Sequence, residues 1–353
     1  MIFHFHFFGG DLAASLWERI YRHASGFGSA GVDLFFVLSG YLITGILFET
    51  RDRPTYYRTF YARRTLRIFP LYYASLAVFY GLGPLLMQWA QHQASIGEVI
   101  RPASQHYAWT YLLNWPIGLY GWRFAPELLQ HFWTLSIEEQ FYLAWPLIVR
   151  TFNRRRLMVV CAALTLFSLA ARLVLHNLDM DSAAHRWTFC RMDSLAIGAF
   201  VALCQRDEQG WLRLQRITTQ VSVIASIGLA LVAAFPHSAF SLSTIDITLR
   251  GLLFGGVLAI LIDAPATSLA HKSASAPILR FFGKYSYCLY VVHQPVSLVL
   301  RKGGVTFDRL TGMLHNQALA IVAVNTAAFA ISIALAYLSW HAFEKHFLKL
   351  KPA

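Results

Sequence analysis

Two arginines three residues apart, Arg64 and Arg67, are the residues whose type and spacing most directly suggest chemistry. They lie in a basic stretch between two apolar segments of membrane-crossing length, residues 32–48 and 68–88. Side chains three apart share one face of a helix, and the planar guanidinium grips phosphate through two parallel hydrogen bonds. We expect both arginines to lie in a loop at a helix start, where they bind a soluble anionic ligand at the membrane surface.

The composition indicates an integral membrane protein, because 56% of the 353 residues are hydrophobic, 15% are aromatic and only 14% are charged. A helix needs about 20 mainly apolar residues to cross a bilayer. The sequence predicts an all-α, polytopic transmembrane helix bundle of about ten helices, with the first one truncated because the apolar residues 1–8 are too few to cross. The other spans are expected near residues 31–49, 67–89, 132–150, 157–176, 187–204, 217–235, 244–263, 280–300 and 317–343.

The chain reads as a single membrane domain over residues 1–353, without internal repeats, low-complexity tracts or a shift in composition. All four cysteines fall within apolar spans, so no disulfide framework is expected. The longest loop, residues 91–130, contains a half-apolar stretch at residues 107–120 that is rich in Trp and Tyr. We predict a re-entrant or interfacial segment that covers a site, and an aromatic membrane anchor is the alternative.

The formal charge of +12 could suit a nucleic-acid-binding protein, but its distribution favours another explanation. If the loop after span 31–49 is cytoplasmic, the loops on that side collect more than twice as many Lys and Arg residues as those opposite. This is the bias of the positive-inside rule. We therefore expect membrane lipids and no nucleic acid among the partners, with the end of the chain in the cytoplasm. Residues 1–8 carry no sign of a cleavable signal.

Ionisable residues within the predicted spans form a short list, and each costs a few kcal/mol in lipid unless it is paired or faces a cavity. They are His4, His6, Asp33, Glu138, Glu139, Arg172, Arg191, Asp193, Arg250, His293, His341 and Glu344. Arg191 and Asp193 are two residues apart and cannot face one another on a helix, so each needs a partner on another helix. Asp33 and Glu344 lie near span ends, where we expect structural caps or ion pairs.

Four fragments of the chain together carry a family resemblance. They are GVDLFFVLSGYLI at residues 31–43, FYARRTLRIFPLYY at 60–73, FWTLSIEEQFY at 132–142 and YSYCLYVVHQP at 285–295, with RMDSLAIG at 191–198 as a weaker fifth. In their order and spacing they resemble the acyltransferase-3 family of integral membrane O-acyltransferases, which acylate sugars of bacterial surface polysaccharides, lipopolysaccharide among them. The resemblance implies a multi-pass protein of the bacterial inner membrane.

The family's first helix carries a catalytic histidine, with an arginine about three turns before it. The ending of that pattern resembles residues 2–5, which makes His4 the better match and His6 the second choice. The arginine would precede Met1, so the chain looks truncated at its start relative to the family. An interfacial histidine without a role is the alternative for both residues.

Acyl transfer from a thioester to a sugar hydroxyl needs a base for the hydroxyl proton and stabilisation of the oxyanion. A histidine in a partly apolar cavity suits the first task, and a nearby carboxylate can fix its tautomer. Glu138 is the candidate for that orienting role, while Glu139, about 100° further round the helix, is expected to face elsewhere. The resemblance assigns acyl-coenzyme A, as donor substrate, to Arg64 and Arg67 from the cytoplasm, with an outward-facing sugar as acceptor.

Further residues are candidates for lining the cavity, namely Asp33, Ser136, Arg191, Asp193 and His293. For His293, beside Pro295, a structural hydrogen bond to a neighbouring helix is an equal alternative. No cofactor and no metal are expected, since His4 and His6 have the wrong spacing for one helical face. The acyl group, the acceptor sugar and the oligomeric state stay open.

Two readings other than an active enzyme remain. A transporter or flippase of a lipid-linked sugar would show internal repeats and paired interrupted helices, and neither is visible. A catalytically inactive scaffold is conceivable because the first-helix arginine is absent.

Overall fold

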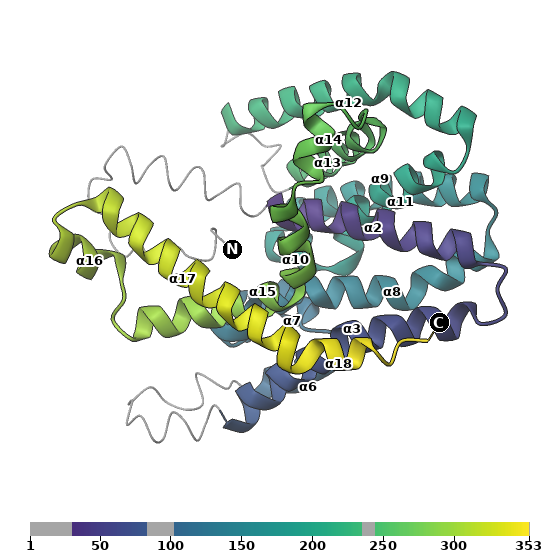
Figure 1. The fold of residues 1–353 in the computed structure, drawn as a ribbon. Coiled ribbons are helices and arrows are strands. Elements are labelled where there is room, and N and C mark those ends of the chain that lie inside the picture. The colour runs from purple at the N-terminus through teal and green to yellow at the C-terminus, as the bar shows by residue number, and fades with distance from the viewer. Residues whose placement is uncertain (1–29, 83–101, 235–243, 353) are drawn as a thin grey trace.

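The computed structural model describes residues 30–82, 102–234 and 244–352, and these form helices and connecting loops without any β-strand (Figure 1). The all-α prediction is confirmed. The long helices are α2 (Ala30–Thr50), α3 (Tyr56–Ala77), α8 (Trp133–Thr151), α9 (Arg154–Asn177), α11 (Met192–Gln205), α12 (Glu208–Ala234), α13 (Ile245–Asp263), α15 (Pro277–Lys302) and α17 (Gln317–Ser339). Each predicted span from 31–49 onward overlaps one of them.

Short helical segments connect the long ones. They are η3 (Val78–Leu82), η4 (Pro102–Ser104), α6 (Gln105–Trp109), α7 (Asn114–Tyr120), η5 (Trp122–Phe124), η6 (Glu127–Phe132), α10 (Asp181–Arg186), η7 (Thr188–Cys190), α14 (Leu269–Ala274), α16 (Phe307–Leu314), η8 (Trp340–Glu344) and α18 (Lys345–Leu348). Residues 107–120 thus do not span, as predicted. Instead α7 packs between α8 and α10.

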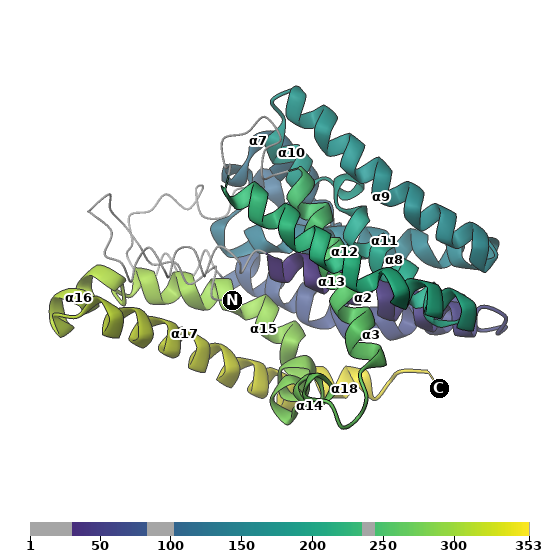
Figure 2. The same ribbon diagram turned by 90° about the horizontal axis from the view of Figure 1, so that it is seen from above.

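The helices pack in pairs that bring distant parts of the chain together. α11 packs against α2 and α9, α12 against α13, and α15 against α17. In Figure 1, α2, α8 and α3 run across the view one below another, and α17 crosses the view diagonally. The view from above in Figure 2 shows α9 at one margin and α17 at the other, with α2, α3 and α8 between them. α18 then packs against α3.

Two glycines bring the backbones of α2 and α11 into contact. A Cβ atom added at Gly40 would lie 1.9 Å from the carbonyl oxygen of Leu195, and one added at Gly198 would lie 1.9 Å from that of Val37. Only glycine fits such a backbone approach, which is a common device where helices cross in membranes. The crossing holds the start of α2 beside the start of α11, where Asp33 and Arg191 lie.

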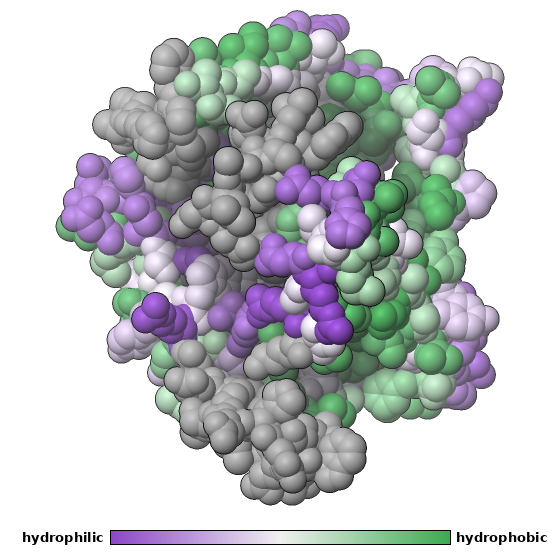
Figure 3. All heavy atoms as spheres, turned by 90° about the vertical axis from the view of Figure 1, so that its left-hand side faces the viewer, coloured by the Kyte–Doolittle hydropathy of each residue, from purple (hydrophilic) through white to green (hydrophobic). Residues whose placement is uncertain are grey.

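Five helical segments among the described residues are long and apolar enough to cross a membrane, namely Ala30–Thr50, Arg154–Asn177, Glu208–Ala234, Ile245–Asp263 and Gln317–Leu348. The chain is a multi-pass membrane protein. Figure 3 shows hydrophobic residues gathered over one side of the face that it presents, apart from the hydrophilic residues at its centre. α3, α8 and α15 are not among these five segments, and all three contribute residues to the cavity described below.

Two boundaries differ from the prediction. α3 begins at Tyr56 and not near residue 67, because Tyr56 and Phe60 are buried and make residues 56–66 part of the packed helix. The predicted span 187–204 is broken between Trp187 and Arg191, so that only Met192–Gln205 is a continuous α-helix. The break lets Arg191 and Asp193 reach partners on different helices.

Candidate active site

A cavity of about 1260 Å³ lies between α2, α3, α8, α13 and α15. Asp33 and Thr50, at opposite ends of α2, both line it. They are separated by about 26 Å along the axis at 1.5 Å per residue. The cavity therefore extends along nearly the whole length of a membrane-spanning helix.

One end of this cavity is basic. Its lining there includes Arg53, Arg63, Arg64, Arg67 and Lys351. Within the described ranges, no carboxylate lies within 4.0 Å of a nitrogen of any of these five side chains. Unpaired cations grouped in one recess create a positive potential that favours an anionic ligand.

Arg64 and Arg67 belong to the interior of α3, so the prediction that they lie in a surface loop was wrong. The buried residues of α3 recur every four positions, at Tyr56, Phe60, Ile68, Tyr72 and Leu76. Arg64 occupies the one gap in that series, about 12 Å from the start of the helix at 1.5 Å per residue. The two guanidiniums thus lie inside the cavity wall.

Hydrogen bonds between α3 and α8 fix the position of Arg64. The hydroxyls of Tyr56 and Tyr61 donate to the carbonyls of Pro146 and Leu143, each at 2.9 Å. In this register the guanidinium carbon of Arg64 lies over the ring of Tyr142, 4.7 Å from its centre. A cation above an aromatic face is attracted by the negative potential of the ring.

Tyr142 also connects Arg64 to Glu138. The Tyr142 hydroxyl donates to Oε1 of Glu138 at 3.0 Å, and the hydroxyl of Ser39 lies 2.5 Å from the same phenol oxygen. Glu138 is buried but lines the cavity. Glu139 does not line it, as its position one residue further round the helix predicted. A buried carboxylate therefore faces the cavity next to its basic end.

The opposite end of the cavity is built from ion pairs. Asp33, which is fully buried, contacts Arg191 at 2.5 Å and Arg250 at 3.2 Å, and Arg250 also pairs with Asp246. The prediction that Arg191 and Asp193 need partners on other helices is confirmed, since Asp193 pairs with Arg172 at 2.6 Å. Asp33 and Arg191 both line the cavity, as predicted.

Two histidines line the same end. His293 is buried, and its Nδ1 lies 2.5 Å from the carbonyl oxygen of Tyr290 one turn before it. His185 has Nδ1 2.9 Å from the carbonyl of Asp181, and burial lowers its pKa to about 4. An Nδ1 atom beside a carbonyl oxygen carries a proton, so Nε2 is the basic nitrogen of the neutral His185 ring.

Some predicted site residues lie elsewhere. Ser136 and Asp193 are not among the cavity-lining residues. The Ser136 hydroxyl donates to the carbonyl of Phe132 at 3.1 Å, and the Asp193 carboxylate is taken up by Arg172, Thr248 and the Ser194 backbone. His4 and His6 lie outside the described residues.

Comparison with known proteins identifies the chain at this point. The sequence profile described as an acyltransferase domain, that of the acyltransferase-3 family, matches residues 1–341. The chain belongs to the acyltransferase-3 family. No solved structure matches it.

Similar proteins include bacterial O-acetyltransferases. The O-acetyltransferase OatA of Staphylococcus aureus strain NCTC 8325 / PS 47 is 29% identical over 297 residues, which are 76% of this chain and 46% of OatA. The putative peptidoglycan O-acetyltransferase YrhL of Bacillus subtilis strain 168 is 30% identical over 289 residues, 77% of this chain and 44% of YrhL. The chain thus spans about half the length of the curated relatives it matches.

Several residues of this acyltransferase-3 cavity escaped the sequence prediction. Tyr142 stands in the same fragment as Glu138, and its position one turn later was the available signal. Arg250 is an intramembrane charge, and such residues mark functional sites by default. Arg63 and Lys351 carried no signal beyond their charge, because only the folded chain brings them together.

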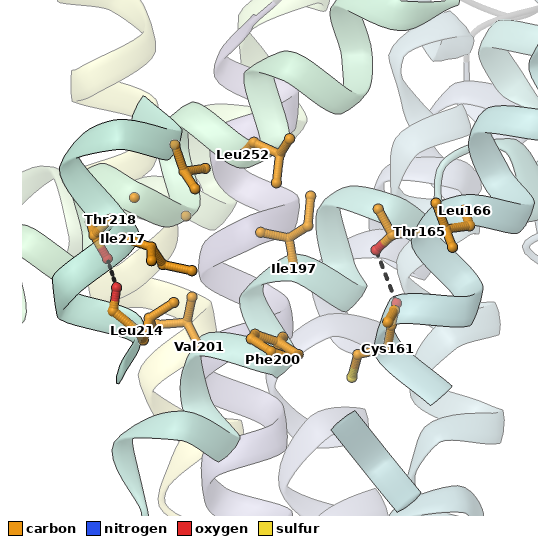
Figure 4. A pocket seen from close by; sticks show the side chains of 14 residues that line it. Cys161, Thr165, Leu166, Ile197, Phe200, Val201, Leu214, Ile217, Thr218 and Leu252 are labelled. Atoms are coloured by element: carbon orange, nitrogen blue, oxygen red, sulfur yellow. Dashed lines mark hydrogen bonds between the residues drawn. The ribbon is translucent and has the colours of Figure 1, made fainter. Parts of the chain in front are cut away.

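A smaller cavity of about 350 Å³ lies between α9, α11, α12 and α13 (Figure 4). Ile197 and Phe200 of α11 project between the helices that carry Thr165 and Thr218. Both threonine hydroxyls donate to carbonyls of their own helices, those of Cys161 at 2.9 Å and Leu214 at 2.8 Å. The surface of this cavity is almost entirely hydrocarbon, so it is no candidate for the chemistry.

Arg172 holds the fold of this acyltransferase-3 domain behind the active-site end. It is fully buried and donates to the Thr244 carbonyl at 2.8 Å, to Asp193 at 2.6 Å, and to Cys190 and Thr248. The network joins α9, α11 and α13.

We expect Arg172→Leu to destabilise the protein by about 3–5 kcal/mol, because Asp193 would remain as a buried charge without its cation. The measurement is the thermal unfolding midpoint in detergent. Arg155→Leu, at an exposed position one residue into α9, is the matched control. The double variant Arg172→Leu/Asp193→Leu should be milder than the single one. Equal midpoints for Arg172→Leu and Arg155→Leu would show that the network adds nothing to stability.

Proposed function

We propose that this chain is a membrane O-acyltransferase that moves an acyl group, acetyl in the simplest case, from acyl-coenzyme A to a hydroxyl of an extracytoplasmic glycan. The observation that carries the proposal is the single cavity, which connects five unpaired cations to the ion-paired end past a buried carboxylate. Acyl-coenzyme A enters at the basic end from the cytoplasm. Its pantetheine arm extends along α2 toward Glu138, and the glycan approaches from the other end.

The reaction balances without a further reactant. The sugar oxygen attacks the thioester carbonyl carbon, a C–O bond forms, and collapse of the tetrahedral oxyanion breaks the C–S bond. The base takes the hydroxyl proton and returns it to the coenzyme A sulfur. We assign the base to His4, with His6 as the second choice, and the orientation of that base to Glu138. The products are an O-acyl sugar and coenzyme A.

The donor assignment is supported by the fit between the charges and the ligand. Coenzyme A carries a pyrophosphate and a 3′-phosphate, and the forked guanidiniums of Arg64 and Arg67 suit such oxygens. Their recessed position lets the phosphates enter the cavity, and it shortens the distance that the pantetheine arm must cover to reach Glu138.

The acceptor assignment is supported by the relatives, of which one is named an O-acetyltransferase and another a putative peptidoglycan O-acetyltransferase. A cell-wall glycan is therefore the acceptor class that we propose. The end of the cavity near Trp122, Trp133 and Arg186 offers aromatic faces on which a sugar ring can stack.

Replacing both Arg64 and Arg67 with alanine should weaken coenzyme A binding by about 100-fold or more, since each charged hydrogen-bonding partner contributes about 1.5–3 kcal/mol. The phosphate contacts persist unchanged from ground state to transition state, so KM for acetyl-coenzyme A should rise while kcat changes little. Calorimetry with coenzyme A and acetylation of a muropeptide acceptor, both in lipid nanodiscs, measure the two quantities.

Arg58→Ala is the matched control, because Arg58 is exposed on the same helix and does not line the cavity. Lysines at 64 and 67 should restore affinity poorly, having the charge but not the planar fork. Unchanged coenzyme A affinity in the double alanine variant would rule out this donor site.

A further inference from the structure

The segment that follows α18 returns to the basic end of the cavity. Nε and Nη2 of Arg63 both donate to the carbonyl oxygen of Pro352, at 3.1 and 3.0 Å. This two-pronged contact fixes the backbone next to Lys351, whose side chain lines the cavity together with Arg64 and Arg67. The preceding helix α18 packs along α3, which adds a second attachment for the segment.

Lys351 lies in a strongly positive environment. Burial lowers its pKa, and Arg67, Arg64 and Arg63 lower it further by repulsion. The charge of Glu344 acts on Arg67, and those of Glu138 and Glu139 act on Arg64. Among the described residues, none of these three carboxylates forms an ion pair with Arg63, Arg64, Arg67 or Lys351. Four cations, Arg63, Arg64, Arg67 and Lys351, thus lie at one end of the cavity. Their mutual repulsion destabilises the fold unless a bound anion neutralises it.

We propose that Lys351 is a further phosphate-binding residue of the donor site, and that Arg63 is the positioning residue that holds it there through the Pro352 carbonyl. The inference rests on the proposed function, since it takes coenzyme A as the ligand. It gives the ligand one more contact, the ammonium of Lys351 on its flexible side chain, beside the planar guanidiniums of Arg64 and Arg67. Lys351 lies beyond residue 341, where the match to the family profile ends.

The hydrogen bonds give Arg63 and Lys351 different roles. Two donor atoms of Arg63 are occupied by the carbonyl, whereas no hydrogen bond engages the Lys351 ammonium within the described part of the chain. The ammonium is therefore available to a phosphate oxygen that enters the cavity between it and Arg64. Pro352 has no polar side chain, and it takes part only through the carbonyl oxygen that accepts both hydrogen bonds from Arg63.

Lys351→Ala should weaken coenzyme A binding about 10-fold, the effect of one lost charge-assisted contact. Lys349→Ala is the matched control, because Lys349 is exposed in the same segment, loses the same charge and does not line the cavity. Calorimetry in nanodiscs gives the affinities, and turnover with acetyl-coenzyme A gives KM and kcat. KM should rise with little change in kcat.

Acetyl-pantetheine, a donor that lacks all phosphates, distinguishes a phosphate contact of Lys351 from a structural role of this residue. Its turnover should be the same in the wild type and in Lys351→Ala, because no phosphate is there to be contacted. A fall in acetyl-pantetheine turnover equal to that seen with acetyl-coenzyme A would overturn the phosphate assignment and reveal a purely structural role.

Arg63→Ala tests the positioning role. It should weaken coenzyme A binding in the wild type but add little in the Lys351→Ala background, since Arg63 acts through Lys351. Additive losses would overturn the positioning role. Equal coenzyme A affinities for Lys351→Ala and Lys349→Ala would refute the inference while the Arg64/Arg67 double variant still tests the proposed function. If that double variant also binds normally, the donor site itself fails.

Discussion

Glu138→Gln should reduce acyl transfer by about 100-fold or more, while the protein remains inserted and folded. The amide keeps the size of the side chain and can still accept the hydrogen bond that Tyr142 donates at 3.0 Å. It lacks the negative charge that stabilises a transient imidazolium on the base and fixes its tautomer. The loss should therefore fall on kcat, with coenzyme A affinity nearly unchanged.

The neighbouring residue supplies the control for this prediction. Glu139→Gln makes the same chemical change one position further along α8, on a side chain that does not line the cavity. Its kcat should stay within a few-fold of the wild type. Tyr142→Phe should fall between the two variants, because it removes the hydrogen bonds of the phenol with Glu138 and Ser39 and keeps the carboxylate. Equal activities of the two glutamine variants would remove Glu138 from the mechanism.

His4→Ala should abolish acylation of the glycan, because it removes the proposed base. His6→Ala is the comparison, with the same loss of an imidazole two residues away and a smaller expected effect. Both variants should bind coenzyme A like the wild type, since neither residue belongs to the proposed donor site. Product acylation measured by mass spectrometry ranks the two. A reversed ranking would assign the base to His6, and full activity of both variants would exclude either histidine.

The fold could be predicted from hydropathy because apolar stretches of bilayer length leave few alternatives to helices. The boundaries that failed are those where polar residues belong to the interior of the protein. α3 begins at Tyr56 because its polar face lines a cavity and not lipid. Residues 56–66 therefore looked like a loop on a hydropathy scale. The four-residue spacing of Tyr56, Phe60 and Ile68 was the better signal, since it placed Arg64 on the buried face.

The ion pairs, too, could be predicted only in part. Helix geometry alone showed that Arg191 and Asp193 could not pair with one another, but it could not name Asp33 or Arg172 as their partners. Those pairs depend on the Gly40–Gly198 crossing and on the break before α11. Lys351 was beyond prediction for a different reason. Nearly 290 residues separate it from Arg63, and the contacts that join the two segments, the Pro352 carbonyl and the packing of α18 on α3, exist only in the folded chain.

The break before α11 also bears on the distance that the acyl group covers in the proposed reaction. α11 has 14 residues and rises about 21 Å, less than the roughly 30 Å of hydrocarbon in a bilayer. Non-helical backbone at that depth is tolerated only where protein or water surrounds it, and Arg191 at the break lines the cavity. At the basic end, Arg64 lies about 12 Å inside α3. On the proposed route with acyl-coenzyme A as donor, the pantetheine arm has to bridge only the part of the cavity that lies between Arg64 and Arg191.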